Sequence, residues 1–384
     1  MKKVISIILA TVLVFTSFSV LASAKIIEND ATLQFNEDGK FKILHVCDIQ
    51  DTWFTASQAL DYIAATCDAE KPDLVVLGGD NIHGYAGDGI TQFTAELKVK
   101  IAIDHYMSIF EERNIPTAIV FGNHDGEEMV SKEAQIEMYK KYNCFIGIDE
   151  GPNIYGCGNY NIPIMSSDGK NTAYNLWFFD SGSKYEDTWN YDYIRDDQVD
   201  WYVKKSNQLK AENNGQVVPS FVFQHIAVPE IFDAIEEGTL IDGVIAERPS
   251  PSPYESKQFS AVLKQGDVKA MFFAHDHINT YTINYKGLDL VCTPGSGFCS
   301  YGDDNRGARV IELDEKDTST YKSRLVNFKD NYVTDEVELC RWKMNSTEYD
   351  DFVRALNGIR YFYKSVASGK NVLGLIYEII STFL

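Results

Sequence analysis

The sequence predicts an α/β fold, and three features lead to that prediction. Apolar strand-like runs alternate with helical stretches through most of the chain, as they do in βαβ units. Polar residues of metal-ligand type follow five of these runs. Of the 384 residues, 45% are hydrophobic and 24% are charged. This composition is typical of globular proteins and excludes a disordered chain, a collagen and a small disulfide scaffold.

The expected elements follow from this alternation in chain order. Three strands and three helices come first, strands at 42–47, 73–77 and 117–121 and helices at 57–69, 95–113 and 131–142. Three further strands, with helices between them, are expected at 174–179, 217–223 and 269–273, the helices lying near 196–212 and 255–264. Short strands without helices then follow at 279–284, 288–292 and 308–313. The segment 146–172 is rich in Gly, Asn and Pro and is expected to be an irregular insertion.

The N-terminal segment 1–24 has the pattern of a secretory signal peptide. Lys2 and Lys3 precede an apolar run from 4 to 20, and Ala22-Ser23-Ala24 matches a cleavage site. The alternative is a membrane anchor, but the run is slightly short and no stop-transfer charges follow. We therefore expect export through the secretory pathway to an extracellular or cell-surface location, and a folded domain at 25–332.

Residues 333–384 are expected to form a C-terminal helical extension. Segment 346–362 has a helical pattern, and Ile376, Ile379, Ile380 and Phe383 fall at helical spacing near the end. A helix that packs back on the core is the favoured interpretation. Membrane association of this tail is the alternative, but the segment lacks the Lys/Arg-rich polar face of such helices.

The charge of the chain bears on which ligands it can bind, and its cysteine content bears on disulfide pairing. Lys and Arg number 35 and Asp and Glu number 56, giving a net charge of −21. Such a chain repels nucleic-acid phosphate, so broad nucleic-acid binding is not expected. The seven cysteines are an odd number, so at least one thiol of an exported protein would lack an intramolecular partner. The pairs Cys144/Cys157 and Cys292/Cys299 each bracket a loop and are compatible with disulfides or with free thiols.

The chemistry of the chain is concentrated at the ends of five strands, where ligands bind in α/β sheets. The five blocks are Asp48-Ile49-Gln50-Asp51, Gly78-Gly79-Asp80-Asn81, Gly122-Asn123-His124-Asp125, Gln224-His225 and Ala274-His275-Asp276-His277. They contain four of the seven histidines. Carboxylate, amide oxygen and imidazole together, without thiolate, suit Mn, Fe, Zn or Mg ions.

In order and spacing, the five blocks resemble the calcineurin-like metallophosphoesterase superfamily, whose pattern is D-x-H, G-D, G-N-H-[DE], H and G-H-x-H. Three further stretches resemble its purple-acid-phosphatase-29 and Dcr-type branch, namely Gly79-Asp80-Asn81-Ile82, Phe223-Gln224-His225-Ile226 and Arg306-Gly307-Ala308-Arg309. The resemblance covers most of 41–313. It implies a four-layer α/β/β/α sandwich, in which two mixed β-sheets are flanked by helices.

The resemblance also implies a role for each matching residue. Asp48, Asp80 and His277 match ligands of a first metal, and Asp80 bridges to a second. Asn123, His225 and His275 match the other ligands of the second metal. His124 matches a non-ligand histidine that binds phosphate or protonates the leaving group, and Asp48 and Asp125 are candidates to orient its ring. With two divalent or trivalent metal ions, such a site hydrolyses phosphate mono- or diesters of small molecules through a metal-activated hydroxide.

The sequence departs from the family pattern at the first metal. Gln50 stands where the family usually has a ligand histidine, and an amide oxygen is a weaker ligand for borderline metals. His83 occupies the position where purple acid phosphatases have a tyrosine. We hypothesise that His83 replaces the missing imidazole; the alternative is a loop histidine near the mouth of the site. Ala274 replaces the usual glycine of the last block.

These departures leave two function classes open. The first is a secreted metal-dependent phosphoesterase, with the first metal site either intact or weakened. The second is a metal-binding surface protein with weak or no catalysis because Gln50 replaces a ligand histidine. Retention of His124 favours the enzyme, because metal binding alone does not need a non-ligand histidine. Aromatic residues near the motifs either line a substrate cleft or pack the loops: Trp53, Phe54, Tyr85, Trp189, Tyr191, Tyr193, Phe298 and Tyr301.

Overall fold

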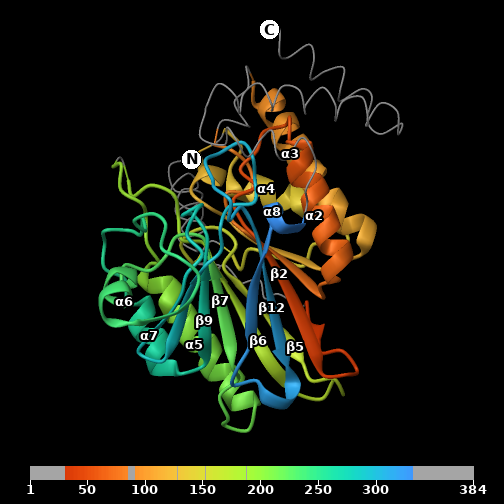
Figure 1. Cartoon of the computed structure of the whole chain (residues 1–384). Coiled ribbons are helices and arrows are strands. Elements are labelled where there is room, and N and C mark those ends of the chain that lie inside the picture. Colours follow the sequence, from red (N-terminus) through yellow and green to blue (C-terminus); the bar gives the residue numbers. More distant parts are fainter. Residues whose placement is uncertain (1–30, 85–90, 128, 152, 187, 332–384) are drawn as a thin grey trace, which may run out of the picture.

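Two mixed β-sheets face each other in the computed structural model, which describes residues 31–331 except 85–90, 128, 152 and 187 (Figure 1). The five-stranded sheet has the order β13-β12-β2-β3-β4. Its strands are β2 (Lys40–Val46), β3 (Leu74–Gly78), β4 (Thr117–Val120), β12 (Gly307–Asp314) and β13 (Lys322–Asn327). Strands β2, β3 and β4 are parallel, whereas β12 runs antiparallel to β2 and to β13.

The second sheet has eight strands in the order β1-β5-β6-β7-β9-β11-β10-β8. In chain order they are β1 (Leu33–Gln34), β5 (Tyr160–Met165), β6 (Thr172–Phe179), β7 (Ser220–Gln224), β8 (Thr239–Asp242), β9 (Val268–Phe273), β10 (Thr282–Tyr285) and β11 (Leu288–Cys292). Strands β6, β7, β9 and β11 form its parallel centre. The carboxyl ends of β7 and β9 therefore lie at one edge.

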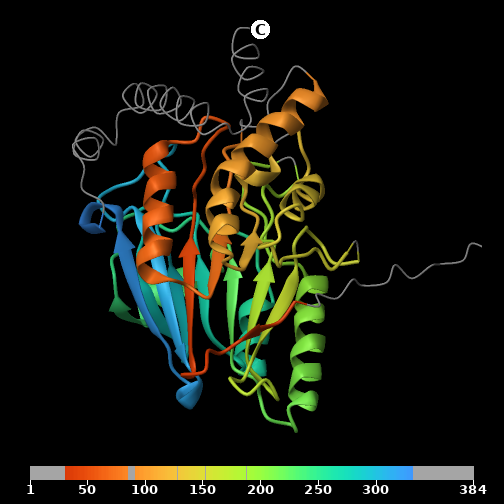
Figure 2. The same cartoon turned by 90° about the vertical axis from the view of Figure 1, so that its right-hand side faces the viewer.

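Helices cover the outer face of each sheet, which completes the four layers (Figure 2). The five-stranded sheet carries α2 (Ser57–Glu70), α3 (Gln92–Arg113) and α4 (Lys132–Tyr139). The eight-stranded sheet carries α5 (Asp196–Glu212), α6 (Ile231–Glu237) and α7 (Gln258–Gln265). Short turns of helix complete the described chain at η1 (His124–Gly126), η2 (Glu315–Asp317) and α8 (Phe328–Asn331).

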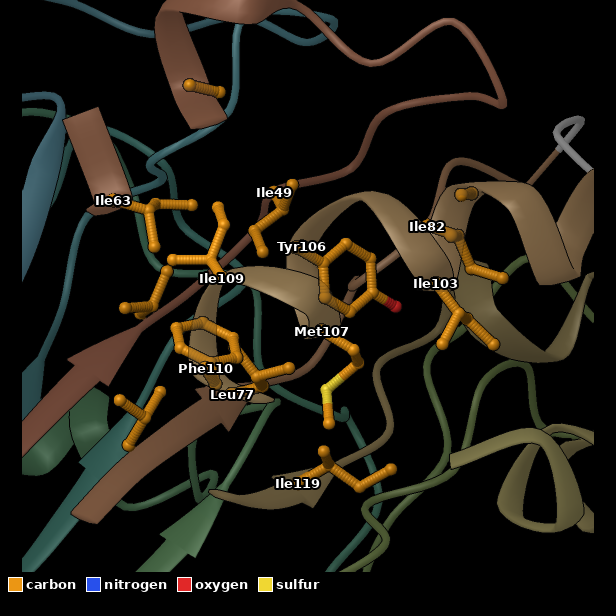
Figure 3. Packing of buried hydrophobic residues seen from close by; sticks show 14 of the residues in the cluster. Ile49, Ile63, Leu77, Ile82, Ile103, Tyr106, Met107, Ile109, Phe110 and Ile119 are labelled. Atoms are coloured by element: carbon orange, nitrogen blue, oxygen red, sulfur yellow. The ribbon is translucent and has the colours of Figure 1, made fainter. Parts of the chain in front are cut away.

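Alternation along the central strands creates separate apolar cores between these layers. On β2, Leu44 and Val46 face the helices, whereas Ile43 faces the other sheet. This is the period of two that a strand imposes on its side chains. Figure 3 shows the helix-side core, where Tyr106, Met107 and Phe110 of α3 pack over β3 and β4. A strand buried on both faces is held in a fixed register, and its last residue is held with it.

The fold prediction is confirmed, with corrections in the elements. Segment 146–172 is not an irregular insertion throughout, because it contains β5, which pairs with β6. Pro163 interrupts this run and argues against a strand. The structure accommodates it because β1 is only two residues long and pairs with Ile164 and Met165, beyond the proline. The short strands β1, β8 and β13 and the helix α6 were also not expected from the pattern.

The remaining sequence predictions concern the two ends of the chain, membrane-spanning helices and disulfides. The signal peptide 1–24 and the extension 333–384 lie outside the described residues, so both stay predictions. No helix within the described segments is long and apolar enough to cross a membrane. The six described cysteines are free and buried, so the Cys144/Cys157 and Cys292/Cys299 pairs are not disulfides here.

Candidate metal centre

The five polar blocks meet at the end of the sandwich where strands of both sheets have their carboxyl ends. Asp48, Asp80 and Asn123 follow β2, β3 and β4, whereas His225 and His275 follow β7 and β9 of the other sheet. Ligand atoms of Asp80, His225 and His275 all lie within 4.8 Å of one another. Asp48 connects His277 to this group, because its Oδ1 atom lies 3.3 Å from Nε2 of His277 and 3.9 Å from Nε2 of His225.

Backbone conformation turns several of these side chains into the centre. Asp48, Gln50, Asp80 and His275 all have positive φ, between 39° and 70°. Such angles are uncommon for residues other than glycine and cluster at functional sites, where the surrounding structure holds the strain. Asp48, Asp80 and His275 each lie two residues after a buried strand, and Gln50 lies four residues after β2.

Close packing leaves no room for a side chain beneath the ligands. Gly79 has φ of +94°, and a Cβ atom there would lie 2.5 Å from Nδ1 of His225. A Cβ atom on Gly122 would lie 2.2 Å from Oδ1 of Asp80. The glycines of the Gly79-Asp80 and Gly122-Asn123 blocks therefore let the ligands from the two sheets approach each other.

Backbone carbonyls fix the orientation of two histidine rings. Nδ1 of His225 lies 3.0 Å from the carbonyl oxygen of Gly78, and Nδ1 of His277 lies 2.9 Å from that of Tyr301. A hydrogen on each Nδ1 leaves Nε2 as the atom with a free lone pair, which is the usual arrangement of metal-ligating histidines. Nε2 of His225 lies 3.2 Å from Oδ2 of Asp80.

The centre contains buried polar atoms without hydrogen-bond partners. They are Oδ1 of Asp48, Oε1 of Gln50, Oδ1 of Asn123 and Nε2 of His225. The contacts of His225 with Asp80 and of Asp48 with His277 are ion-pair contacts that lack hydrogen-bond geometry. Leaving such atoms unsatisfied costs about 1–3 kcal/mol each. Four of the predicted ligands share this property, and their donors are of the type that hard-to-borderline cations prefer. The chemistry of these residues therefore fits metal ions.

The pKa values of the residues in the centre are shifted by their mutual interactions. Burial opposes a charge on His225, but the Asp80 carboxylate outweighs it and raises the pKa of His225 to about 9. Burial likewise opposes ionisation of Asp80, yet the His225 imidazolium holds the pKa of Asp80 well below its usual range. Burial and the neighbouring His225 lower the pKa of His275. A cation that replaces the proton on His225 would satisfy the same carboxylate.

His124 stands beside this group with a half-buried side chain, 30% exposed. Its backbone N–H donates to Oδ1 of Asp80 at 2.8 Å, which ties the histidine to the expected bridging ligand. Its Nδ1 atom lies 2.5 Å from Oε2 of Glu127. Burial opposes the imidazolium, but Glu127 and Asp80 together raise the pKa of His124.

The carboxylate that contacts the His124 ring belongs to Glu127, which was not the expected partner. Asp48 and Asp125 were expected to orient His124, but the contact at Nδ1 belongs to Glu127. The Asp125 carboxylate instead accepts the backbone N–H groups of Gly122 at 2.7 Å and Ile82 at 3.1 Å, so it joins the loops after β3 and β4. Glu127 lies three residues after His124 on a helical turn, and that spacing was the signal that could have revealed it.

His83 lies beside His124 in the structure. Their rings are stacked, with centroids 5.9 Å apart and planes 12° apart. His83 is not a member of the Asp80–His225–His275 group. Its role as a replacement ligand stays a hypothesis, as do the ligand roles of Asp48, Gln50, Asn123 and His277.

Two aromatic side chains border the histidine ligands. The Tyr301 ring is stacked on His277 at 4.2 Å, and its hydroxyl donates to Glu247. The Tyr191 ring lies edge-on to His275, with centroids 4.4 Å apart. Burial and the Asp80 and Glu127 carboxylates raise the pKa of Tyr191, so its hydroxyl stays protonated near neutral pH. Two of the aromatic residues expected near the motifs therefore border the centre.

Comparison with known proteins agrees with this architecture. The sequence profile described as calcineurin-like phosphoesterase matches residues 41–279, more than half of the chain. The four layers and the ligands at the strand ends define the same class, and the chain belongs to the calcineurin-like phosphoesterase family.

Relatives of known name place the chain within that family. "Probable inactive purple acid phosphatase 14" of Arabidopsis thaliana is 28% identical over 81% of this chain and 84% of that protein. "Probable inactive purple acid phosphatase 29" of the same plant is 30% identical over 73% of this chain and 79% of that protein. "Phosphatase DCR2" of Saccharomyces cerevisiae is 25% identical over 77% of this chain but only 55% of that protein. The branch expected from the sequence is confirmed.

Proposed function

We propose that this protein is a metal-dependent phosphoesterase that hydrolyses phosphate mono- or diesters at a dinuclear centre. The observation that carries the proposal is the set of unpartnered ligand atoms on Asp48, Gln50, Asn123 and His225, with His124 beside them. Asp48, Gln50 and His277 would hold the first ion, whereas Asn123, His225 and His275 would hold the second. Asp80 would be shared, and His83 remains a candidate replacement ligand at the first.

When bound, such ions supply a water of lowered pKa and positive charge opposite the phosphate. The residues of the chain do the remaining work. His225 and His277 present Nε2 because Gly78 and Tyr301 hold the opposite ring nitrogens. His124 contacts the phosphate and donates a proton to the leaving oxygen as general acid. Glu127 keeps that ring oriented through Nδ1.

The names of the Arabidopsis relatives, "probable inactive", support the second candidate, a metal-binding protein without useful catalysis. Gln50 is the observation that favours it, because an amide binds softer ions weakly. The enzyme is favoured by the pairing of His124 with Glu127, because neither residue is among the predicted metal ligands. We also propose that the protein is exported, on the basis of the 1–24 pattern alone.

A direct test uses purified mature chain with p-nitrophenyl phosphate and its bis ester, added Mn²⁺ and a chelator control. Chelator-sensitive turnover of either ester supports the enzyme, and the preferred ester separates monoesterase from diesterase. The variant His124→Ala should lose activity while its metal content stays unchanged. Metal binding without turnover in the wild-type protein, across several metals and both esters, would favour the binding protein.

A further inference from the structure

A small hairpin stands at the rim of the metal centre. Its described residues are 183–186 and 188–191, and we call it the rim hairpin. Lys184 and Tyr191 pair across it in an antiparallel bridge. The hydroxyl of Ser183 donates to the carbonyl oxygen of Asn123 at 2.7 Å, and Tyr191 contacts His275. The hairpin is therefore fixed to two predicted ligands of the second metal.

The rim hairpin carries two polar groups for which the described residues offer no hydrogen-bond partner. The Lys184 ammonium lies over the Tyr191 ring, with Nζ 4.5 Å from the centroid. Within the described part of the chain, neither this ammonium nor the Tyr191 hydroxyl has a side-chain or backbone hydrogen-bond partner. No carboxylate among the described residues pairs with this ammonium, although the chain has a net charge of −21. Lys132, near the same loops, does pair, with Asp180 at 2.9 Å.

The position of these groups suggests what they bind. Tyr191 contacts both Lys184 and His275, so a single aromatic ring links the ammonium to a predicted metal ligand. The phosphate to be hydrolysed would lie against the metal ligands and His124. The Lys184 ammonium, one aromatic ring away from the predicted ligand His275, is placed to contact a second anionic group of the same substrate. The Tyr191 phenol contacts both residues and can donate a hydrogen bond to an anionic oxygen.

We propose that Lys184 and Tyr191 form a subsite for a second anionic group, and that the preferred substrates are phosphate esters carrying a further phosphate. This inference rests on the proposed function for the identity of the first phosphate site. A hydrogen bond from a charged donor to a phosphate oxygen is short and strong. The subsite therefore gives specificity for bisphosphates over simple monophosphates, whereas the metal centre alone would bind both.

The test compares two non-hydrolysable probes by calorimetry on the full-length mature protein with Mn²⁺. Methylenediphosphonate carries two anionic groups, and orthophosphate carries one. The variant Lys184→Met keeps the aliphatic stem over Tyr191 and removes the charge. We expect it to weaken methylenediphosphonate binding about tenfold, which is about 1.4 kcal/mol, and to change orthophosphate binding less than about twofold. Tyr191→Phe, which removes only the hydroxyl, should weaken methylenediphosphonate several-fold.

A matched control exists in the same fold. The Lys286 ammonium lies over the Tyr285 ring at the same 4.5 Å, in the turn between β10 and β11. Lys286→Met should change neither affinity. Equal weakening of both probes by Lys184→Met, or no effect on either, would overturn the subsite. So would a wild-type protein that binds orthophosphate and methylenediphosphonate equally well. Because binding needs no turnover, a protein that discriminates between the probes but hydrolyses no ester would refute only the proposed function.

Discussion

Oε2 of Glu127 lies 2.5 Å from Nδ1 of His124, and this contact joins the only imidazole proposed for proton donation to a carboxylate outside the predicted ligand set. Glu127→Gln should keep the fold and the metals but hold the ring less firmly. General acid catalysis contributes about 10²- to 10⁴-fold, so we expect kcat to fall by roughly tenfold or more with little change in KM.

Steady-state kinetics with metal analysis checks this prediction. Glu137→Gln is the control, because the exposed Glu137 side chain of α4 pairs with Lys140 and the substitution should leave kcat unchanged. Equal kcat in Glu127→Gln and wild type would show that the contact does not position the acid.

Gln50 is predicted to contribute its amide oxygen to the first metal site. Gln50→Ala should lower the metal content from two ions per chain towards one, because Asp48, His277 and the shared Asp80 would hold an ion weakly without a fourth ligand. Gln50→His should restore the imidazole typical of the family and tighten binding of Zn²⁺ relative to Mg²⁺. Mass spectrometry of metals per chain, after dialysis, measures both. An unchanged metal content in Gln50→Ala would exclude Gln50 as a ligand.

Comparing Gly79→Ala with Gly215→Ala separates the effect of backbone strain from the effect of contact with a predicted ligand. Gly79→Ala places a Cβ atom 2.5 Å from Nδ1 of His225 at φ of +94°. Gly215→Ala has a similar φ of +80° but meets nothing within 4 Å. Both should lose about 1–2 kcal/mol of stability because of the left-handed backbone. Only Gly79→Ala should also lose metal, and equal metal content in the two variants would contradict the packing argument.

The buried His105 should make the free energy of unfolding depend on pH. It is buried in α3 against Thr55, and burial lowers its pKa to about 3. Below the ordinary histidine pKa of about 6.5, His105 therefore binds a proton in the unfolded chain but stays neutral in the folded protein. The contribution is fully present above pH 6.5 and is lost as the pH falls towards 3. Between pH 8 and pH 5, this single group should cost about 2 kcal/mol of unfolding free energy.

Urea unfolding at the two pH values measures that cost. His105→Gln keeps a polar group near Thr55 but does not titrate, so its stability should fall less between pH 8 and pH 5 than that of the wild type. Parallel losses in the two proteins would mean that His105 does not couple folding to pH.

The α/β class, the order of the main elements and the strand-end position of every candidate ligand followed from the sequence. Long apolar runs such as 117–121 and 269–273 are strands in the structure because burial on both faces demands that pattern. Strand β5 could not be predicted, because Pro163 is tolerated only where the neighbouring strand β1 is too short to need its N–H. That circumstance depends on a pairing between residues more than a hundred positions apart.

The sequence by itself determined which chemical groups gather at the centre, because parallel strands bring their carboxyl ends to one edge. Only the tertiary structure decided how those groups act. The nitrogens that His225 and His277 present depend on the carbonyls of Gly78 and Tyr301. The Gly78 carbonyl lies in the opposite sheet from His225. The position of Lys184 over Tyr191 depends on how the rim hairpin is fixed to Asn123. Such contacts join distant segments, so no local pattern of residues specifies them.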